Sequence, residues 1–205
     1  MDLAGEVPGA TPIDDVSGLR QAHIKTRPQL NAAEAENIRQ ATVRYLIRQP
    51  TRQSASFNVA WFRKLHREMF GRVWKWAGTW RQNQTNVGVA PAWIEVEMLQ
   101  LEADLLAWSN ATAAMPLMEQ ALRLHHRAVH IHPFTNGNGR WSRMLANIWL
   151  RRHGQSIIEW PDSVIGTAST IRDQYLHAVR KADGGDFEPL AELHRRYQGG
   201  SPASS

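Results

Sequence analysis

The sequence predicts a mainly α-helical single domain, a helical bundle that carries one small β-hairpin. Apolar residues recur at helical spacing through most of its 205 residues. A single stretch, RQNQTNVGVAP at 81–91, is typical of extended, exposed chain and is the expected hairpin. A chain of this length buries a full core as one unit, and no internal repeat divides it.

The elements follow one another with recognisable start and stop residues. We expect residues 1–30 to run extended over the surface, residues 31–198 to form the domain, and residues 199–205 to be a disordered tail. The first helix is expected at 31–49, where Asn31 and Glu34 have the spacing of a capping box. Further helices are predicted at 58–71, 92–109, 116–131, 139–153, 167–182 and 187–197.

The composition limits the classes of function. A net charge of +5 suits an acidic partner such as a nucleotide, whereas the short basic runs at 151–153 and 194–196 are typical of solvated helix ends. The absence of cysteine excludes disulfides and thiol catalysis. No apolar run of about 18 residues is present for a membrane helix, and the acidic first residues lack a signal-peptide pattern. We therefore expect a cytoplasmic protein without membrane contact, of undetermined oligomeric state.

The stretch HPFTNGNGR, His132–Arg140, joins two of the predicted helices. Paired Asn-Gly dipeptides usually indicate a hairpin, but the flanks have helical periodicity. The first N–H groups of a helix lack internal partners and carry the positive end of its dipole, and Gly137 and Gly139 allow close approach of a ligand. Arg140 and Arg143 add charge on one side of the new helix. These features predict a phosphate site with a histidine beside it, which suggests phosphoryl or nucleotidyl transfer.

The same residues carry a resemblance to a known family. His132, Pro133, Phe134, Gly137, Asn138, Gly139, Arg140 and Arg143 resemble the Fic/Doc signature H-P-F-x-[DE]-G-N-G-R-x-x-R. Similarity to the Fic subfamily called mobile mystery protein B extends over nearly the whole chain, through GATPIDD, IKTRPQLN, LHREMFGRVWKWAGTWR and ADGGDFEPL. The resemblance implies the Fic fold and transfer of AMP from ATP to a Ser, Thr or Tyr hydroxyl of a target protein. It also implies a bacterial, toxin-like setting with a small helix-turn-helix companion protein.

The resemblance assigns roles to individual residues. His132 would be the general base, because the ordinary pKa of histidine lies near working pH. Phe134 would anchor the loop in the core. The phosphates would be held by Gly137, Asn138, Gly139, Arg140 and Arg143. The hairpin would be the Fic flap, an exposed edge that pairs with an extended target segment, with an ordinary surface hairpin as the alternative. Its residues are Thr85, Asn86, Val87, Gly88 and Val89.

Asn136 departs from the signature, which has an acidic residue there. A carboxylate would bind Mg²⁺, a hard cation that prefers anionic oxygen, whereas asparagine offers a neutral amide oxygen. We expect Mg²⁺ to act with ATP nonetheless, held largely by phosphates and water. Preference for another nucleotide, or inactivity, is the alternative.

An inhibitory helix of pattern [ST]-x-x-x-E-[GN] is a further feature of many Fic proteins, in which its glutamate pairs with the second motif arginine. AAEAEN resembles its end, with Glu36 followed by Asn37 but Ala32 at the Ser/Thr position. We therefore expect Glu36 to pair with Arg143 and block the γ-phosphate. Glu34 is explained by the capping box, and an ordinary first-turn glutamate is the alternative for Glu36.

Other functions stay open from sequence alone. The same site could transfer UMP, a phosphoryl group or phosphocholine, or the chain could be a weakly active Fic scaffold that binds a partner or DNA. His126 and His130, four apart on a predicted helix, have the spacing of a metal-chelating pair. No second cluster of ligand residues accompanies them in the sequence, which favours helix-face or core histidines.

Overall fold

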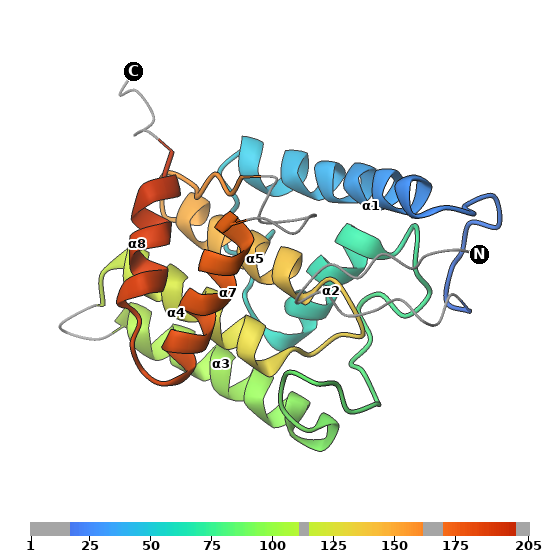
Figure 1. The fold of residues 1–205 in the computed structure, drawn as a ribbon. Coiled ribbons are helices and arrows are strands. Elements are labelled where there is room, and N and C mark those ends of the chain that lie inside the picture. Colours follow the sequence, from blue (N-terminus) through green and yellow to red (C-terminus); the bar gives the residue numbers. More distant parts are fainter. Residues whose placement is uncertain (1–16, 111–114, 162–169, 200–205) are drawn as a thin grey trace.

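The structure, a computed structural model, describes residues 17–110, 115–161 and 170–199. Figure 1 shows helix α5 running through the centre, with α1 and α2 on one side and α4, α7 and α8 on the other. In chain order the elements are α1 (Arg27–Thr42), the π-helical turn η1 (Val43–Ile47), α2 (Val59–Phe70), the 3-10 turn η2 (Pro91–Trp93), α3 (Ile94–Asn110), α4 (Leu117–Ile131), α5 (Asn138–Arg152), α7 (Thr170–Asp183) and α8 (Glu188–Tyr197).

The mainly α-helical class is confirmed, but the predicted hairpin is wrong. The described residues contain no strand, only isolated bridges between Leu19 and Trp74 and between Ile158 and Gln198. The segment 81–90 is an irregular loop because its backbone groups bond elsewhere. Nη1 of Arg81 donates to the Asn83 carbonyl at 2.9 Å, Nη2 of Arg81 donates to the Val89 carbonyl, and the Val89 N–H donates to the Ile131 carbonyl at 3.3 Å. A hairpin would need those groups for its ladder.

Helix α5 is the core helix. Every residue from Trp141 to Leu150 is buried, so the helix is enclosed on all sides, as expected of one at the centre of a domain. The Trp141 indole N–H donates to the Phe62 carbonyl of α2 at 3.2 Å, and its ring meets Phe134 edge-on at 5.0 Å. The residues that begin α5 are therefore held in a fixed position by the core. Among the described residues, no helix combines the length and apolarity that crossing a bilayer requires.

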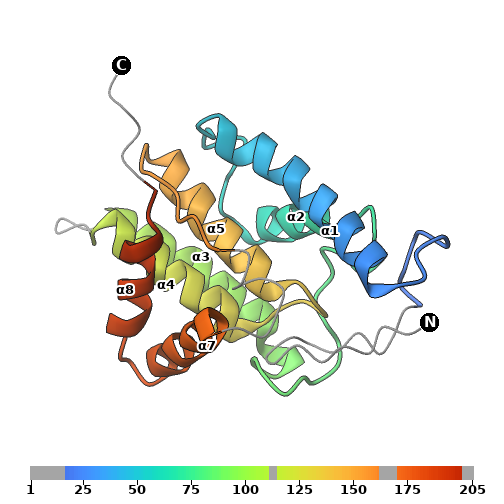
Figure 2. The same ribbon diagram turned by 45° about the horizontal axis from the view of Figure 1, so that its top comes forward.

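A second, smaller core lies where α7 and α8 pack on α4. Figure 2 shows this pair on the side of α4 that faces away from α1. Its apolar members are Leu122, Tyr175, Ala178, Val179, Ala182, Leu190 and Leu193. Buried polar groups cross it: Nε2 of His125 bonds to the Tyr175 hydroxyl at 3.0 Å, and Nδ1 of His125 to Nε2 of His194 at 2.9 Å. Burial lowers the pKa of His194 to about 3 and that of His125 well below its ordinary value, so both imidazoles are neutral.

The start of α1 differs from the prediction. The helix begins at Arg27, one turn earlier than expected, with Thr26 as its N-cap and Gln29 completing a capping box. Pro28 in the first turn favours this start, because proline's fixed φ suits the beginning of a helix. The predicted box of Asn31 and Glu34 is thus wrong, and Glu34 lies inside the helix, available for tertiary contact.

The remaining boundaries agree with the predicted ones within a few residues. Helix α2 is capped by Asn58, whose side chain accepts the Trp61 N–H, and it ends at Gly71. Of the expected extended segment, residues 17–26 are described; most are exposed, and Ile24 is buried. Residues 1–16, the start of the predicted helix at 167–182 and the tail beyond residue 199 lie outside the described residues.

Candidate active site

His132 lies directly after α4 in a left-handed backbone conformation, with φ 52° and ψ 56°. Such angles cost a non-glycine residue about 1–3 kcal/mol and persist only where neighbours hold them. The contacts that do so are on both sides of the residue. The His132 N–H bonds to the Ala128 carbonyl at 3.3 Å, and the His132 carbonyl accepts from Nε of Arg81 at 2.7 Å. The imidazole is therefore placed by a strained turn, as is common at functional sites.

The environment of His132 keeps its imidazole neutral. Burial, followed by the nearby Arg81 guanidinium, lowers its pKa to about 4, and a hydrogen bond to the Val129 carbonyl opposes this only in part. A neutral imidazole at pH 7 can accept a proton, which is the first requirement of a general base.

Arg81 is a site residue that the sequence did not reveal. It is 3% exposed, and its guanidinium donates to the carbonyls of His132, Asn83 and Val89. Its own N–H donates to the Pro133 carbonyl at 2.9 Å. Arg81 thus fastens the loop 82–88 to the turn that carries His132. No sequence pattern predicts this role, because a buried arginine in a polar stretch cannot be distinguished by sequence from an exposed one.

The motif loop is supported from within by His66 and Asn138. His66 of α2 stacks on Phe134 at 3.6 Å, and its Nδ1 accepts the Gly78 N–H at 3.0 Å. Its Nε2 therefore carries the hydrogen and donates to the Asn136 carbonyl, also at 3.0 Å. Burial lowers the His66 pKa to about 3. The Asn138 side chain bonds both backbone groups of Phe134, at 2.9 and 2.8 Å, and so holds the motif loop in shape.

The amino end of α5 has the geometry of an anion site. Gly137 has φ +80°, and a Cβ there would meet the Phe70 ring at 2.6 Å, so only glycine fits. The first amide of the helix to bond back is that of Trp141, to the Gly137 carbonyl at 2.9 Å. Helix geometry leaves the preceding N–H groups, those of Asn138, Gly139 and Arg140, without intrahelical acceptors. Backbone donors of this kind bind phosphate well.

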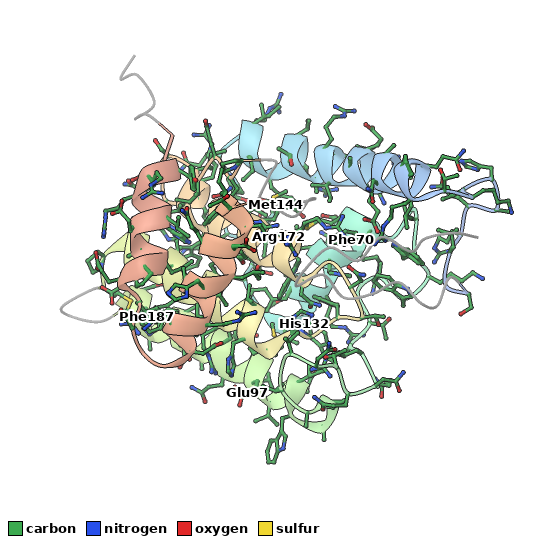
Figure 3. The ribbon with its side chains drawn as sticks, viewed as in Figure 1. Phe70, Glu97, His132, Met144, Arg172 and Phe187 are labelled. Carbon is green, nitrogen blue, oxygen red and sulfur yellow. The ribbon has the colours of Figure 1, made fainter. Side chains whose placement is uncertain are left out.

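The two motif arginines flank this helix end but point in different directions. The Arg140 guanidinium lies 4.8 Å from the Phe70 ring and pairs with Glu34. The buried Arg143 guanidinium lies 5.4 Å from the Tyr175 ring of α7. Burial lowers the pKa of Arg143, and the nearby guanidinium groups of Arg140 and of Arg172, which is also on α7 and buried, lower it further. Figure 3 shows Arg172 and Phe70 on either side of α5, with His132 below them. Arg172 is a second residue that sequence reasoning missed.

Glu34, and not Glu36, is the glutamate of α1 that reaches the motif. Oε2 of Glu34 accepts from Nη1 of Arg140 at 2.6 Å, and Oε1 accepts from the buried Trp74 indole N–H at 2.6 Å. Glu36 is exposed and pairs with Arg39 and Gln40 of its own helix, which lower its pKa to about 2. The expected contact between Glu36 and Arg143 is therefore wrong. Leu30, Glu34, Asn37 and Ala41 form the buried face of α1, and Glu36 lies outside it.

Asn136 does not fit the role of a magnesium ligand. Its Oδ1 accepts the Gly137 N–H at 2.6 Å, and its carbonyl accepts from His66. A neutral amide oxygen that is already engaged is a poor ligand for a hard cation. The side chain instead closes a local turn that shapes the loop. The loop itself therefore suits an anion rather than a cation.

The loop that corresponds to the expected flap lies against His132. A Cβ on Gly88, whose φ is +92°, would meet the Cβ of His132 at 2.5 Å. Thr85 closes the tip by donating from Oγ1 to the Val87 carbonyl at 2.6 Å, and Val87 is 55% exposed. The structure thus brings the predicted segment Thr85–Val89 beside the predicted base, although not as a hairpin.

Comparison with known proteins gives one family. The Fic/DOC family model matches residues 56–150. Protein adenylyltransferase Fic of Drosophila ananassae is 34% identical over 133 residues, which cover 63% of this chain and 25% of that protein. This chain accordingly spans about a quarter of the length of the curated relatives it matches.

Two solved structures share the fold. One is the N-terminal Fic domain of a VirB-translocated Bep effector protein from Bartonella quintana, solved with bound ADP; it has a TM-score of 0.66 and 20% identity, covering 92% of this chain and 94% of that one. The other is BepC protein from Bartonella tribocorum with bound AMPPNP, with a TM-score of 0.64 and 20% identity over 86% of this chain and 89% of that one.

Proposed function

We propose that this chain is a protein adenylyltransferase, because residues 56–150 match the Fic/DOC family model. It transfers AMP from ATP to a hydroxyl side chain of a target protein. The observation that carries the proposal is the neutral His132 imidazole on the loop that leads into the amide groups that begin α5. A proton acceptor next to a phosphate site is what attack of a hydroxyl on phosphorus requires.

In the proposed reaction the target oxygen forms a bond to the α-phosphorus, and the bond from that phosphorus to the oxygen bridging to the β-phosphate breaks. The hydroxyl proton passes to His132, and pyrophosphate leaves with the bonding electron pair. The α5 amides hold the phosphates, and Arg140 and Arg143 offset the charge that develops on the leaving group. Any Mg²⁺ that accompanies ATP would be held by the nucleotide phosphates and water, since Asn136 offers no anionic oxygen.

The loop 82–88 holds the target segment in this proposal. It is largely exposed and lies directly against His132, so a chain laid along it presents a side chain to the base. The carbonyls of Asn83, Thr85 and Val87 already accept hydrogen bonds from side chains of the loop and of Arg81, so the loop offers a target segment its largely exposed surface rather than a free row of carbonyls.

We further propose that Glu34 restrains the enzyme. Arg140 must leave Glu34 before it can bind a phosphate, because one carboxylate and one phosphate compete for the same donors. The resemblance places such a contact on the second motif arginine, whereas Glu34 holds the first.

Mass spectrometry of the purified chain, incubated with a bacterial lysate and labelled ATP or UTP, tests the proposed activity. Addition of one AMP to the chain or to a lysate protein, lost in His132→Ala, supports adenylylation. Addition of UMP instead would assign the alternative nucleotide. No adduct with either nucleotide, from both the wild type and Glu34→Gln, would overturn the proposed transfer.

A further inference from the structure

Two histidines of α4 and one aspartate at the end of α7 meet where the two helices pack. His126 and His130 belong to α4, and Asp183 is the last residue of α7. Nε2 of His126 lies 2.9 Å from Oδ1 of Asp183, and Nδ1 of His130 lies 2.8 Å from the same oxygen. All three atoms lie within 4.8 Å of one another.

The fold, rather than the sequence, brings the third residue to the pair. His126 and His130 are four residues apart and share a helix face, whereas Asp183 lies more than fifty positions later. Packing of α7 and α8 on α4 brings the end of α7 over this face (Figure 2). His126 is nearly buried, while His130 and Asp183 are each about two-fifths exposed, at 43% and 42%. One ligand is thus fixed by the core and two remain open to solvent.

We propose that His126, His130 and Asp183 form a binding site for a divalent transition metal of the Zn²⁺ type. Two imidazole nitrogens and one carboxylate oxygen are a ligand set found in zinc sites, with metal–ligand distances of about 2.0–2.2 Å. Ligands at such distances are roughly 3.3–3.5 Å apart in a tetrahedron. The present contacts of 2.8 and 2.9 Å need to open by about half an ångström. The exposed side chains of His130 and Asp183 permit this, and water completes the coordination.

The choice of metal follows from the donor atoms. Imidazole suits Zn²⁺, Co²⁺ and Ni²⁺, whereas Mg²⁺ and Ca²⁺ prefer sites made of oxygen. The site is therefore separate from any Mg²⁺ that accompanies ATP. Its expected effect is to clamp α7 to the last turn of α4 and so stabilise the second core.

Titration of the full, tag-free chain with Zn²⁺ and with Co²⁺ tests the site. We expect one equivalent to bind, visible absorption bands from bound Co²⁺, and a rise in Tm of about 5–10 °C when free Zn²⁺ is a hundred times its Kd. Loss of even an outer-shell partner weakens metal sites by about 10–100-fold, so His130→Ala and Asp183→Asn should weaken binding at least as much.

The matched control is His177→Ala, which removes another exposed histidine of α7 that lies outside the cluster. It should bind Zn²⁺ as the wild type does. Absence of saturable binding by the wild type, or unchanged affinity in both His130→Ala and Asp183→Asn, would show that the three residues form a hydrogen-bonded cluster only. Circular dichroism of each variant verifies that it is folded.

Discussion

Replacing Glu34 by glutamine should activate the enzyme by releasing Arg140. The substitution removes the negative charge that pairs with Arg140 at 2.6 Å. It keeps an amide oxygen to accept the Trp74 N–H, which alanine or glycine would leave buried and unsatisfied. Glutamine is therefore the replacement that tests the ion pair with the least damage to the fold.

The size of the effect follows from the contact. The Glu34 side chain is 4% exposed and that of Arg140 is 24% exposed, so solvent screens the pair little. A hydrogen bond to a charged group contributes about 1.5–3 kcal/mol, and each 1.4 kcal/mol is about tenfold in an equilibrium. ATP should accordingly bind Glu34→Gln about 10–150-fold more tightly than the wild type.

Calorimetry with ATP and incorporation of labelled AMP into the protein itself measure the change. Glu36→Gln is the matched control, because Glu36 lies on the same helix but pairs only with Arg39 and Gln40 in solvent. It should stay within about twofold of the wild type, in line with the small contribution of exposed ion pairs. Equal ATP affinity and self-modification in wild type and Glu34→Gln, with both proteins folded, would refute the reasoning; activation by Glu36→Gln alone would do the same.

Four further outcomes are expected. His132→Ala should reduce AMP transfer by about 10²–10⁴-fold with ATP affinity unchanged, and transfer at the wild-type rate would exclude His132 as the base. Asn136→Asp should tighten the dependence on Mg²⁺ and raise the rate; a metal titration that coincides with the wild type would show that this side chain does not reach the ion. Gly88→Ala should slow transfer, because a Cβ there meets His132 at 2.5 Å and φ is +92°; full activity would mean that the loop moves freely. Stability should fall as pH drops from about 6.5 towards 3, by about 1.4 kcal/mol per pH unit for each buried neutral histidine, since the unfolded chain binds protons that folded His66 and His194 refuse. Urea midpoints that do not change between pH 7 and pH 5 would contradict that linkage.

The sequence predicted the helical class and the phosphate loop because both depend on local patterns. The helix that ends at Ile131 and the glycines that follow it carry their own signals of spacing and turn chemistry. The roles of His66 and Arg81 could not be predicted. Each acts through backbone groups that lie far away in the sequence, such as the Asn136 carbonyl for His66 and the His132 carbonyl for Arg81.

The error over Glu34 and Glu36 has a single cause. Both glutamates are compatible with an amphipathic α1, and the choice between them depended on where that helix begins. Asn31 and Glu34 matched a capping box, but Thr26 and Gln29 match one equally well a turn earlier and gain the proline at Pro28. Competition between two valid caps is decided by tertiary packing, here by Trp74 and Arg140, which no local pattern contains.

The attachment of the loop 82–88 at both ends affects how proteins with this loop can change their targets. Both ends are fixed to the turn that carries His132, through the Arg81 N–H on the Pro133 carbonyl and the Val89 N–H on the Ile131 carbonyl. The residues between those ends are mostly exposed and make few contacts with the core. Substitutions there alter the surface offered to a target without moving the histidine. After gene duplication, a descendant can therefore acquire a new target by changes at 82–87 alone, while the residues that perform the chemistry remain under separate constraint.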